Sequence, residues 1–235
     1  MEQLIFELAS PEPPSFANFL PGPNREAVAA LLRLASGDAG ETGLLLWGPP
    51  GVGKTHLLRA TAEAARGRRP VRYCADPGAL VADMPLPAAL VIVDDVDRAD
   101  VAMQGRLFTV YNTLKATGGS LVAAAALPPA RMALRDDLRS RLGWGLVHEV
   151  LPLADGDKPA ALATYAKARG FTLADDVIAY LLAHGRRDMT SLLATLAALD
   201  RHSLASKRPI TTLLVKEWLQ RGLGFSNGAP EDRPR

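Results

Sequence analysis

The strongest chemical signal in the sequence is a glycine-rich loop that ends in a lysine and a threonine. Its residues are Gly48, Pro49, Pro50, Gly51, Val52, Gly53, Lys54 and Thr55. This spacing is typical of loops that bind phosphate, because glycines let backbone N–H groups turn toward phosphate oxygens. Lys54 can then reach the β and γ phosphates of a nucleotide, and the Thr55 hydroxyl can coordinate Mg²⁺. A Gly-Pro-rich turn without this function is the weaker interpretation, because an apolar run precedes the loop and a helical pattern follows it.

Two carboxylates follow the apolar run Leu90–Val93. If this run is a strand beside the one that precedes the loop, its carboxyl end places Asp94 where it can coordinate Mg²⁺. Asp95 is then placed to orient or activate a water molecule. The alternative is that the two acids only begin a helix after the strand. Together, the loop and the acids predict that the chain binds ADP or ATP with Mg²⁺.

The elements that must position these residues alternate along the chain. Five short apolar runs predict strands that are buried on both faces, at 44–47, 71–75, 90–93, 121–125 and 146–150. Helical patterns lie between them, including one that begins at Asn24, a good N-cap, and one over 101–115. This alternation predicts an α/β fold with a parallel sheet.

After Pro152 only helical patterns remain, over 155–169, 175–184 and 188–205 and in a short segment that begins at Thr212. We therefore expect four regions: an N-terminal arm at 1–14, a nucleotide-binding α/β domain at 15–152, a small helical domain at 153–221 and a flexible tail at 222–235.

Composition argues against several classes of protein. The 27 Lys and Arg residues against 25 Asp and Glu give a net charge of +2, which gives no support to extensive contacts with nucleic acid. Apolar runs are shorter than the roughly 18 residues that a membrane span needs, so we expect no membrane partner. Because Cys74 is the one cysteine and no secretory signal is visible, the expected compartment is the cytoplasm.

Several strings resemble the DnaA-type AAA+ ATPase family and, within it, most closely the Hda proteins, the regulatory inactivators of DnaA. They lie at 15–24, 46–58, 107–114, 128–129, 138–145 and 187–189. The string Leu138-Arg-Ser-Arg-Leu-Gly-Trp-Gly is much more specific than the phosphate loop, and the string at 46–58 adds His56 to the residues expected at the nucleotide. The resemblance implies a five-stranded parallel sheet in the order 5-1-4-3-2, and it makes the helical domain a lid.

The resemblance also implies roles for three other residues. Arg141 matches the arginine finger, which acts in trans on the nucleotide of a neighbouring subunit. Arg187 matches a lid arginine that contacts nucleotide in its own subunit, and Leu20 lies in a stretch near the adenine. Two simpler interpretations stay open: Arg187 as a solvated residue at a helix start, and Arg141 as an ion-pair partner of Asp136 or Asp137.

The N-terminal string from Gln3 to Leu8 resembles the peptide with which Hda and other proteins bind the sliding clamp, the beta subunit of DNA polymerase III. An extended backbone places Leu4, Phe6 and Leu8 on one side, where they can fill an apolar groove, while Gln3 supplies hydrogen bonds. The alternative is an edge strand docked on the chain's own core. The resemblance implies that the protein reaches DNA indirectly, through the clamp, at the nucleoid or replisome.

The sequence departs from the family at the end of the fourth strand. Residues 123–127 are Ala-Ala-Ala-Ala-Leu, where the family carries polar side chains that sense the γ-phosphate, so we expect weak or absent ATPase activity. The implied function is negative regulation of replication initiation, in which the protein stimulates hydrolysis of DnaA-bound ATP through Arg141. A homodimer is a further expected assembly. The alternative function is a helicase-loader-like AAA+ ATPase acting on single-stranded DNA, and we expect no initiator-type DNA-binding domain after the lid.

Overall fold

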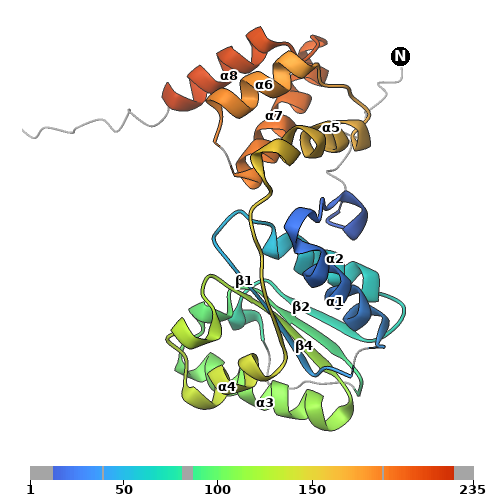
Figure 1. Ribbon diagram of the computed structural model, residues 1–235, viewed down its shortest axis with the longest axis vertical. Helices are drawn as coiled ribbons and strands as arrows, with labels where there is room; N and C mark the ends of the chain where they lie inside the picture. The colour runs from blue at the N-terminus through green and yellow to red at the C-terminus, as the bar shows by residue number, and fades with distance from the viewer. Residues whose placement is uncertain (1–12, 39, 81–86, 187, 225–235) are drawn as a thin grey trace, which may run out of the picture. The chain divides into compact units, whose positions relative to one another are not determined.

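The computed structural model describes residues 13–38, 40–80, 87–186 and 188–224. Two compact units are distinguished, one over 13–154 and one that begins at residue 155. The second unit is entirely helical in its described part, whereas the first contains a sheet covered by helices (Figure 1).

The sheet of the first unit has five parallel strands in the order β2-β3-β4-β1-β5. Read from the other edge, this is the predicted order 5-1-4-3-2, which is confirmed. The strands are β1 (Gly43–Trp47), β2 (Val71–Cys74), β3 (Leu90–Val93), β4 (Ser120–Ala125) and β5 (Leu146–Glu149).

Burial along the strands differs between the centre and the edges of the sheet. Every residue of β3 and β4 is buried, as the continuous apolar runs predict. The prediction is wrong for β2 and β5, where only Cys74 is buried. These are the two edge strands, so each has a neighbouring strand on one side only.

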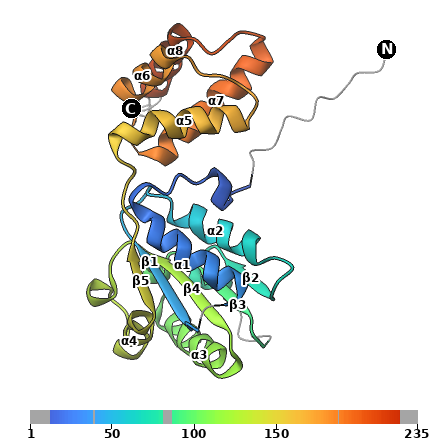
Figure 2. The same cartoon turned by 45° about the vertical axis from the view of Figure 1, so that its right-hand side comes forward.

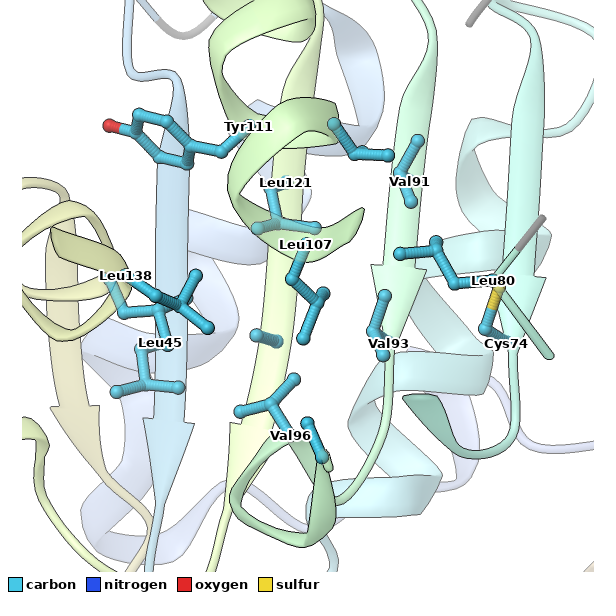
Figure 3. Packing of buried hydrophobic residues seen from close by; sticks show 14 of the residues in the cluster. Leu45, Cys74, Leu80, Val91, Val93, Val96, Leu107, Tyr111, Leu121 and Leu138 are labelled. Carbon is cyan, nitrogen blue, oxygen red and sulfur yellow. The ribbon is translucent and has the colours of Figure 1, made fainter. Parts of the chain in front are cut away.

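Helices cover both faces of the sheet (Figure 2). The strand side chains alternate between faces: Leu44 and Leu46 pack with α1 (Arg25–Ser36) and α2 (Lys54–Ala65). On the other face, Leu45 packs with α3 (Val101–Thr117) and α4 (Asp136–Trp144) (Figure 3). Short 3-10 helices link the elements, at Phe16–Asn18, Gly22–Asn24, Pro77–Ala79, Val96–Arg98 and Pro129–Arg131.

The second unit begins with a 3-10 turn, Asp155–Asp157, and continues with four helices. These are α5 (Lys158–Ala168), α6 (Asp175–His184), α7 (Met189–Ser206) and α8 (Thr212–Gly224). Leucines of α5, α6 and α7 form its core together with Val215 of α8. In the described part of the chain, no helix is long and apolar enough to cross a membrane.

An ion pair is buried inside this helical unit. Arg169 Nε donates to Asp200 Oδ2 at 2.9 Å, and each side chain is only 9% exposed. The guanidinium also lies over the ring of Tyr165, 5.7 Å from its centroid. The pair therefore joins the end of α5 to α7 at a site that water barely reaches.

We expect Asp200→Ala to lower the free energy of unfolding by about 3–5 kcal/mol, because it leaves a buried guanidinium without its counter-charge. Urea unfolding followed by circular dichroism measures this loss. Glu217→Ala, on the exposed side of α8, is the matched control and should change stability by less than about 0.5 kcal/mol. Equal stabilities of the two variants would contradict the expectation.

Candidate nucleotide-binding site

The loop between β1 and α2 requires glycine at two positions. Gly48 has φ 152°, and a Cβ added there would lie 2.5 Å from the backbone oxygen of Val150. Gly53, at the N-cap of α2, has φ 103°, and its added Cβ would lie 2.9 Å from the ring of Phe19. Any larger residue at these two positions would force the loop away from its neighbours. The loop therefore presents its backbone, rather than side chains, to a ligand. A loop of this kind at a helix N-terminus suits an anion.

Lys54 lies against this loop. Its Nζ donates to the carbonyl oxygens of Gly48 at 2.6 Å and Pro49 at 3.0 Å, and the residue is 9% exposed. Burial lowers the pKa of Lys54, an effect opposed by the nearby carboxylates of Asp94 and Asp95. Phosphate oxygens fit this site, because they would give the buried ammonium anionic partners in place of neutral carbonyls.

The two predicted metal ligands are in contact. Thr55 Oγ1 donates to Asp94 Oδ2 at 2.5 Å, while the N–H of Asp95 donates to the other carboxylate oxygen at 3.0 Å. Asp94 is 4% exposed, and burial raises its pKa against the effect of the Thr55 hydrogen bond. Hydroxyl and carboxylate oxygens are ligands that Mg²⁺ accepts. Among the described residues, no cluster of three or more His, Cys, Asp or Glu side chains could hold a metal. Thr55 and Asp94 would supply two oxygen ligands to a cation that nucleotide phosphates also coordinate.

The second acid of the pair is placed differently. Asp95 has the left-handed conformation, with φ 49° and ψ 44°, and directly precedes the 3-10 turn Val96–Arg98. Its carboxylate pairs with Arg98 at 3.2 Å on the surface. The structure therefore directs Asp94 inward and engages Asp95 in an exposed ion pair.

Asp97 is a residue of this region that sequence reasoning missed. Its Oδ2 accepts a hydrogen bond from the N–H of Ala126 at 3.1 Å, directly after β4. The bond ties the segment after β3 to the end of β4, beside the buried alanines at 123–125. Its one sequence signal is an acid three positions after Asp94.

The segment before α1 contacts the first turn of α2 through His56. His56 Nε2 lies 3.0 Å from the backbone oxygen of Ser15, and the His56 ring is 5.4 Å from that of Phe19. Burial lowers the pKa of His56, opposed by its contact with Ser15. Leu20, next to Phe19, is 41% exposed, and its predicted place near the adenine stays a prediction.

Asn24 occupies the predicted N-cap position of α1, but its side chain makes no capping bond. Its amide instead donates to the backbone oxygen of Leu151 at 3.0 Å and accepts from the N–H of Leu151 at 2.8 Å. The predicted N-cap position is therefore confirmed, but the side chain makes no capping bond because it holds the segment that follows β5.

Arg141 lies on α4, which packs on the sheet face opposite α1 and α2. Its Nε donates to Asn112 Oδ1 at 3.2 Å, and its guanidinium carbon is 4.0 Å from the ring centroid of Trp144. The ion-pair interpretation of Arg141 is wrong, since Asp136 pairs with Arg139 and Asp137 pairs with Arg135.

Some predicted site residues lie outside the described residues. They are Gln3, Leu4, Phe6, Leu8 and Arg187. The clamp-binding string and the lid arginine therefore stay predictions.

Two family models match the chain. The model of the bacterial DnaA ATPase domain matches residues 12–74, and that of the Hda lid domain matches residues 155–219. Together they cover more than half of the 235 residues, one model for each structural unit.

Solved structures are similar over most of the chain. Domain III of the replication initiation protein DnaA from Thermotoga maritima has a TM-score of 0.75 at 20% identity, over 87% of this chain and 96% of that one. AMPPCP-bound DnaA from Aquifex aeolicus has a TM-score of 0.66 at 23% identity, over 80% of this chain and 65% of that one. The Holliday junction branch migration motor RuvB from Thermotoga maritima has a TM-score of 0.64 at 19% identity, over 88% and 72%.

These similarities at low identity concern the fold, and each of the two family models adds a sequence match to one part of the chain. The α/β unit has the sheet order of a P-loop AAA+ core, and the helical unit is its lid. The chain is thus similar to the DnaA-type AAA+ proteins: residues 12–74 match the bacterial DnaA ATPase domain, residues 155–219 match the Hda lid domain, and the fold is that of DnaA domain III.

Proposed function

We propose that the protein binds ADP or ATP with Mg²⁺ at the loop before α2. The observation that carries this proposal is the juxtaposition of Lys54, Thr55 and Asp94 beside a loop that requires glycine at positions 48 and 53. Lys54 would hold the β and γ phosphates, and Thr55 with Asp94 would hold the cation. Isothermal titration of the whole protein with ADP and with ATP tests this proposal. No heat of binding with either nucleotide would contradict it.

The cation ligand makes a separate prediction. We expect Asp94→Asn to weaken the Mg²⁺-dependent part of nucleotide binding by about tenfold or more, because an amide replaces an anionic ligand. Titrations with and without Mg²⁺ measure this difference. Glu63→Gln, an exposed acid on α2, is the control and should leave it unchanged. Equal Mg²⁺ dependence of nucleotide binding in Asp94→Asn and in the wild type would contradict the assignment of Asp94 as a cation ligand.

We further propose that the protein regulates replication initiation by stimulating hydrolysis of ATP bound to DnaA. In this account Arg141 reaches into the nucleotide site of DnaA and stabilises charge on the transferring phosphate. The placement of Arg141 on the face opposite α2 supports action on a partner rather than on the chain's own nucleotide. A homodimer is a further part of the proposal.

Weak hydrolysis by the protein itself fits this role. The end of β4 presents Ala123, Ala124 and Ala125, all fully buried, where a hydrolytic site needs polar groups. Turnover of ATP by the protein alone should therefore be slow. Fast turnover stimulated by single-stranded DNA would instead support a helicase-loader-like ATPase.

The proposed tether to the sliding clamp rests on the resemblance of residues 3–8. We expect deletion of residues 1–8 to weaken binding to the clamp by at least about tenfold, because Leu4, Phe6 and Leu8 supply the apolar anchors. Surface plasmon resonance on immobilised clamp measures the affinity, and nucleotide binding should stay unchanged. Undiminished clamp binding by the shortened chain would refute the assignment. Binding of this kind would bring the protein to the replisome.

A further inference from the structure

Positive charge is concentrated between the middle of α2 and the start of β2. Residues 59–72 contain five arginines and one acid, Glu63, so this segment has a net charge of +4. The whole chain has a net charge of +2, so the remaining residues together carry −2. The near-neutral total therefore hides a separation of charge, in which one short segment is more positive than the chain as a whole.

One of the five arginines fixes the turn between α2 and β2. Arg69 donates from Nε to the backbone oxygen of Ala88 at 2.8 Å and from Nη2 to that of Ala89 at 3.1 Å. Its Nη1 donates to the backbone oxygen of Leu34 at 3.0 Å. Each nitrogen of the guanidinium is thus bonded, and the turn is tied to the residues before β3 and to the end of α1. Arg69 is therefore structural, and it gives the neighbouring arginines a fixed base.

The other four arginines are exposed, and they are Arg59, Arg66, Arg68 and Arg72. In the part of the chain that the structure describes, Arg68 and Arg72 have no ion pair. Arg66 pairs with Glu63 at 2.8 Å, but the two side chains are 75% and 46% exposed, so this pair is easily exchanged. The guanidinium carbon of Arg59 lies 5.8 Å from the ring centroid of Tyr73. None of these contacts prevents an anion from reaching the arginines.

Arg66, Arg68 and Arg72 lie at the opposite end of the α/β unit from the proposed nucleotide site. Helix α2 has twelve residues, so Arg66 at its C-cap is about 18 Å from Lys54 at its first turn. In the sheet, the phosphate loop follows the carboxyl end of β1, whereas Arg68 comes before the amino end of β2. A ligand at one end therefore leaves the other end free.

The chemistry of the surface favours the phosphates of duplex DNA over other anionic partners. An arginine fork matches phosphate oxygens. A protein interface would need apolar anchors, but the large exposed apolar side chains lie elsewhere, and residues 59–72, all of them described, contain none. Single-stranded DNA would need an open aromatic face on which bases stack, whereas Tyr73 is half-buried and lies under Arg59.

We propose that Arg59, Arg66, Arg68 and Arg72 form a surface, the arginine edge, that binds the phosphates of duplex DNA. This inference goes beyond the proposed function, because the binding needs neither nucleotide nor DnaA. With about four phosphates contacted, the logarithm of the affinity should fall against the logarithm of the salt concentration with a slope of about −3.6. So few contacts agree with a net charge that gives no support to extensive ones.

Fluorescence anisotropy of a short labelled duplex, titrated with the whole protein at several salt concentrations, tests the inference. A variant with Arg66→Gln, Arg68→Gln and Arg72→Gln loses three contacts, so its affinity at low salt should fall by about tenfold or more and its slope should weaken by about 2.7. The control carries Arg201→Gln, Arg208→Gln and Lys216→Gln, three exposed positions of the helical unit. It loses the same net charge and should keep most of the affinity and of the slope.

A further variant predicts a gain, which unfolding cannot produce. Glu63→Gln removes the one acid of the segment and releases Arg66, so it should strengthen duplex binding by about threefold at low salt. Equal affinities of the triple arginine variant and its control would overturn the inference. Tighter binding of a single strand than of the duplex would also overturn it. Displacement of the duplex by polyglutamate at an equal concentration of charge would assign the surface to acidic proteins instead.

The outcome for DNA is separable from the proposed function. Calorimetric titration with ADP and ATP should give the same affinities for the triple arginine variant as for the wild type, because the arginine edge lies away from the phosphate loop. A wild type that binds nucleotide but no duplex at low salt overturns this inference alone. A wild type that binds the duplex but no nucleotide overturns the nucleotide proposal and supports the arginine edge.

Discussion

Replacing Arg141 by alanine should lower the stimulated rate of hydrolysis of DnaA-bound ATP by about 10³-fold or more. Arginines supplied in trans contribute about 10³–10⁵ in rate to nucleotide hydrolases, because they stabilise charge that appears in the transition state. The substitution removes one half-exposed side chain and leaves Leu138 and Leu142 in the core, so α4 should stay packed.

Arg139→Ala is the matched control for this experiment. Arg139 lies on the same helix and pairs with Asp136 at the surface, so its loss removes the same charge two residues away. Stimulation should survive in Arg139→Ala and disappear in Arg141→Ala, while both variants bind nucleotide as the wild type does. Equal stimulation by the two variants would exclude Arg141 as the group that acts on DnaA.

Replacing Lys54 by alanine should weaken the binding of ADP and ATP by about 10²-fold. A hydrogen bond to a charged group contributes about 1.5–3 kcal/mol, and the Lys54 ammonium lies against the loop that we propose binds the phosphates. Titration calorimetry measures the loss. The fold should persist, because the present partners of Lys54 are two loop carbonyls and no core packing depends on its side chain.

The control for Lys54→Ala is Arg59→Ala on the same helix. The guanidinium of Arg59 lies over the ring of Tyr73, 5.8 Å from its centroid. Replacing Arg59 by alanine removes the same charge as Lys54→Ala. Nucleotide affinity should be unchanged in Arg59→Ala. If both variants lose affinity equally, the effect comes from net charge on α2 and the phosphate site is misassigned.

Much of this site could be predicted because its chemistry depends on strand ends. Parallel strands bring their carboxyl ends to one edge of a sheet, so the acid after β3 and the loop after β1 had to lie near each other. The hydrogen bond between Thr55 and Asp94 is the outcome. Strand order itself followed from resemblance, since apolar runs alone do not specify which strands are neighbours.

Other features could not be predicted, because no local pattern marks them or because their partners are remote in sequence. Helix α4 has nine residues, and in its two and a half turns only Leu138 and Leu142 are buried, too few to give a periodic pattern. The type and position of Asn24 predict a side-chain cap of α1, but its amide instead forms hydrogen bonds with both the N–H and the carbonyl oxygen of Leu151, 127 positions away. The bond from Ala126 to Asp97 likewise depends on two strand ends meeting. Local sequence patterns predict helices and strands. Contacts between residues that are distant in sequence form only when these helices and strands pack together.

The most direct test of the central claim is the rate of ATP hydrolysis by DnaA, measured with and without this protein and the DNA-loaded sliding clamp. The account predicts that the protein and the loaded clamp together accelerate hydrolysis by about 10³-fold, on the scale of an arginine supplied in trans. The protein without the clamp should have a smaller effect at the same concentration, because tethering raises its effective concentration near DnaA. An unchanged rate of hydrolysis with both components present would contradict the account.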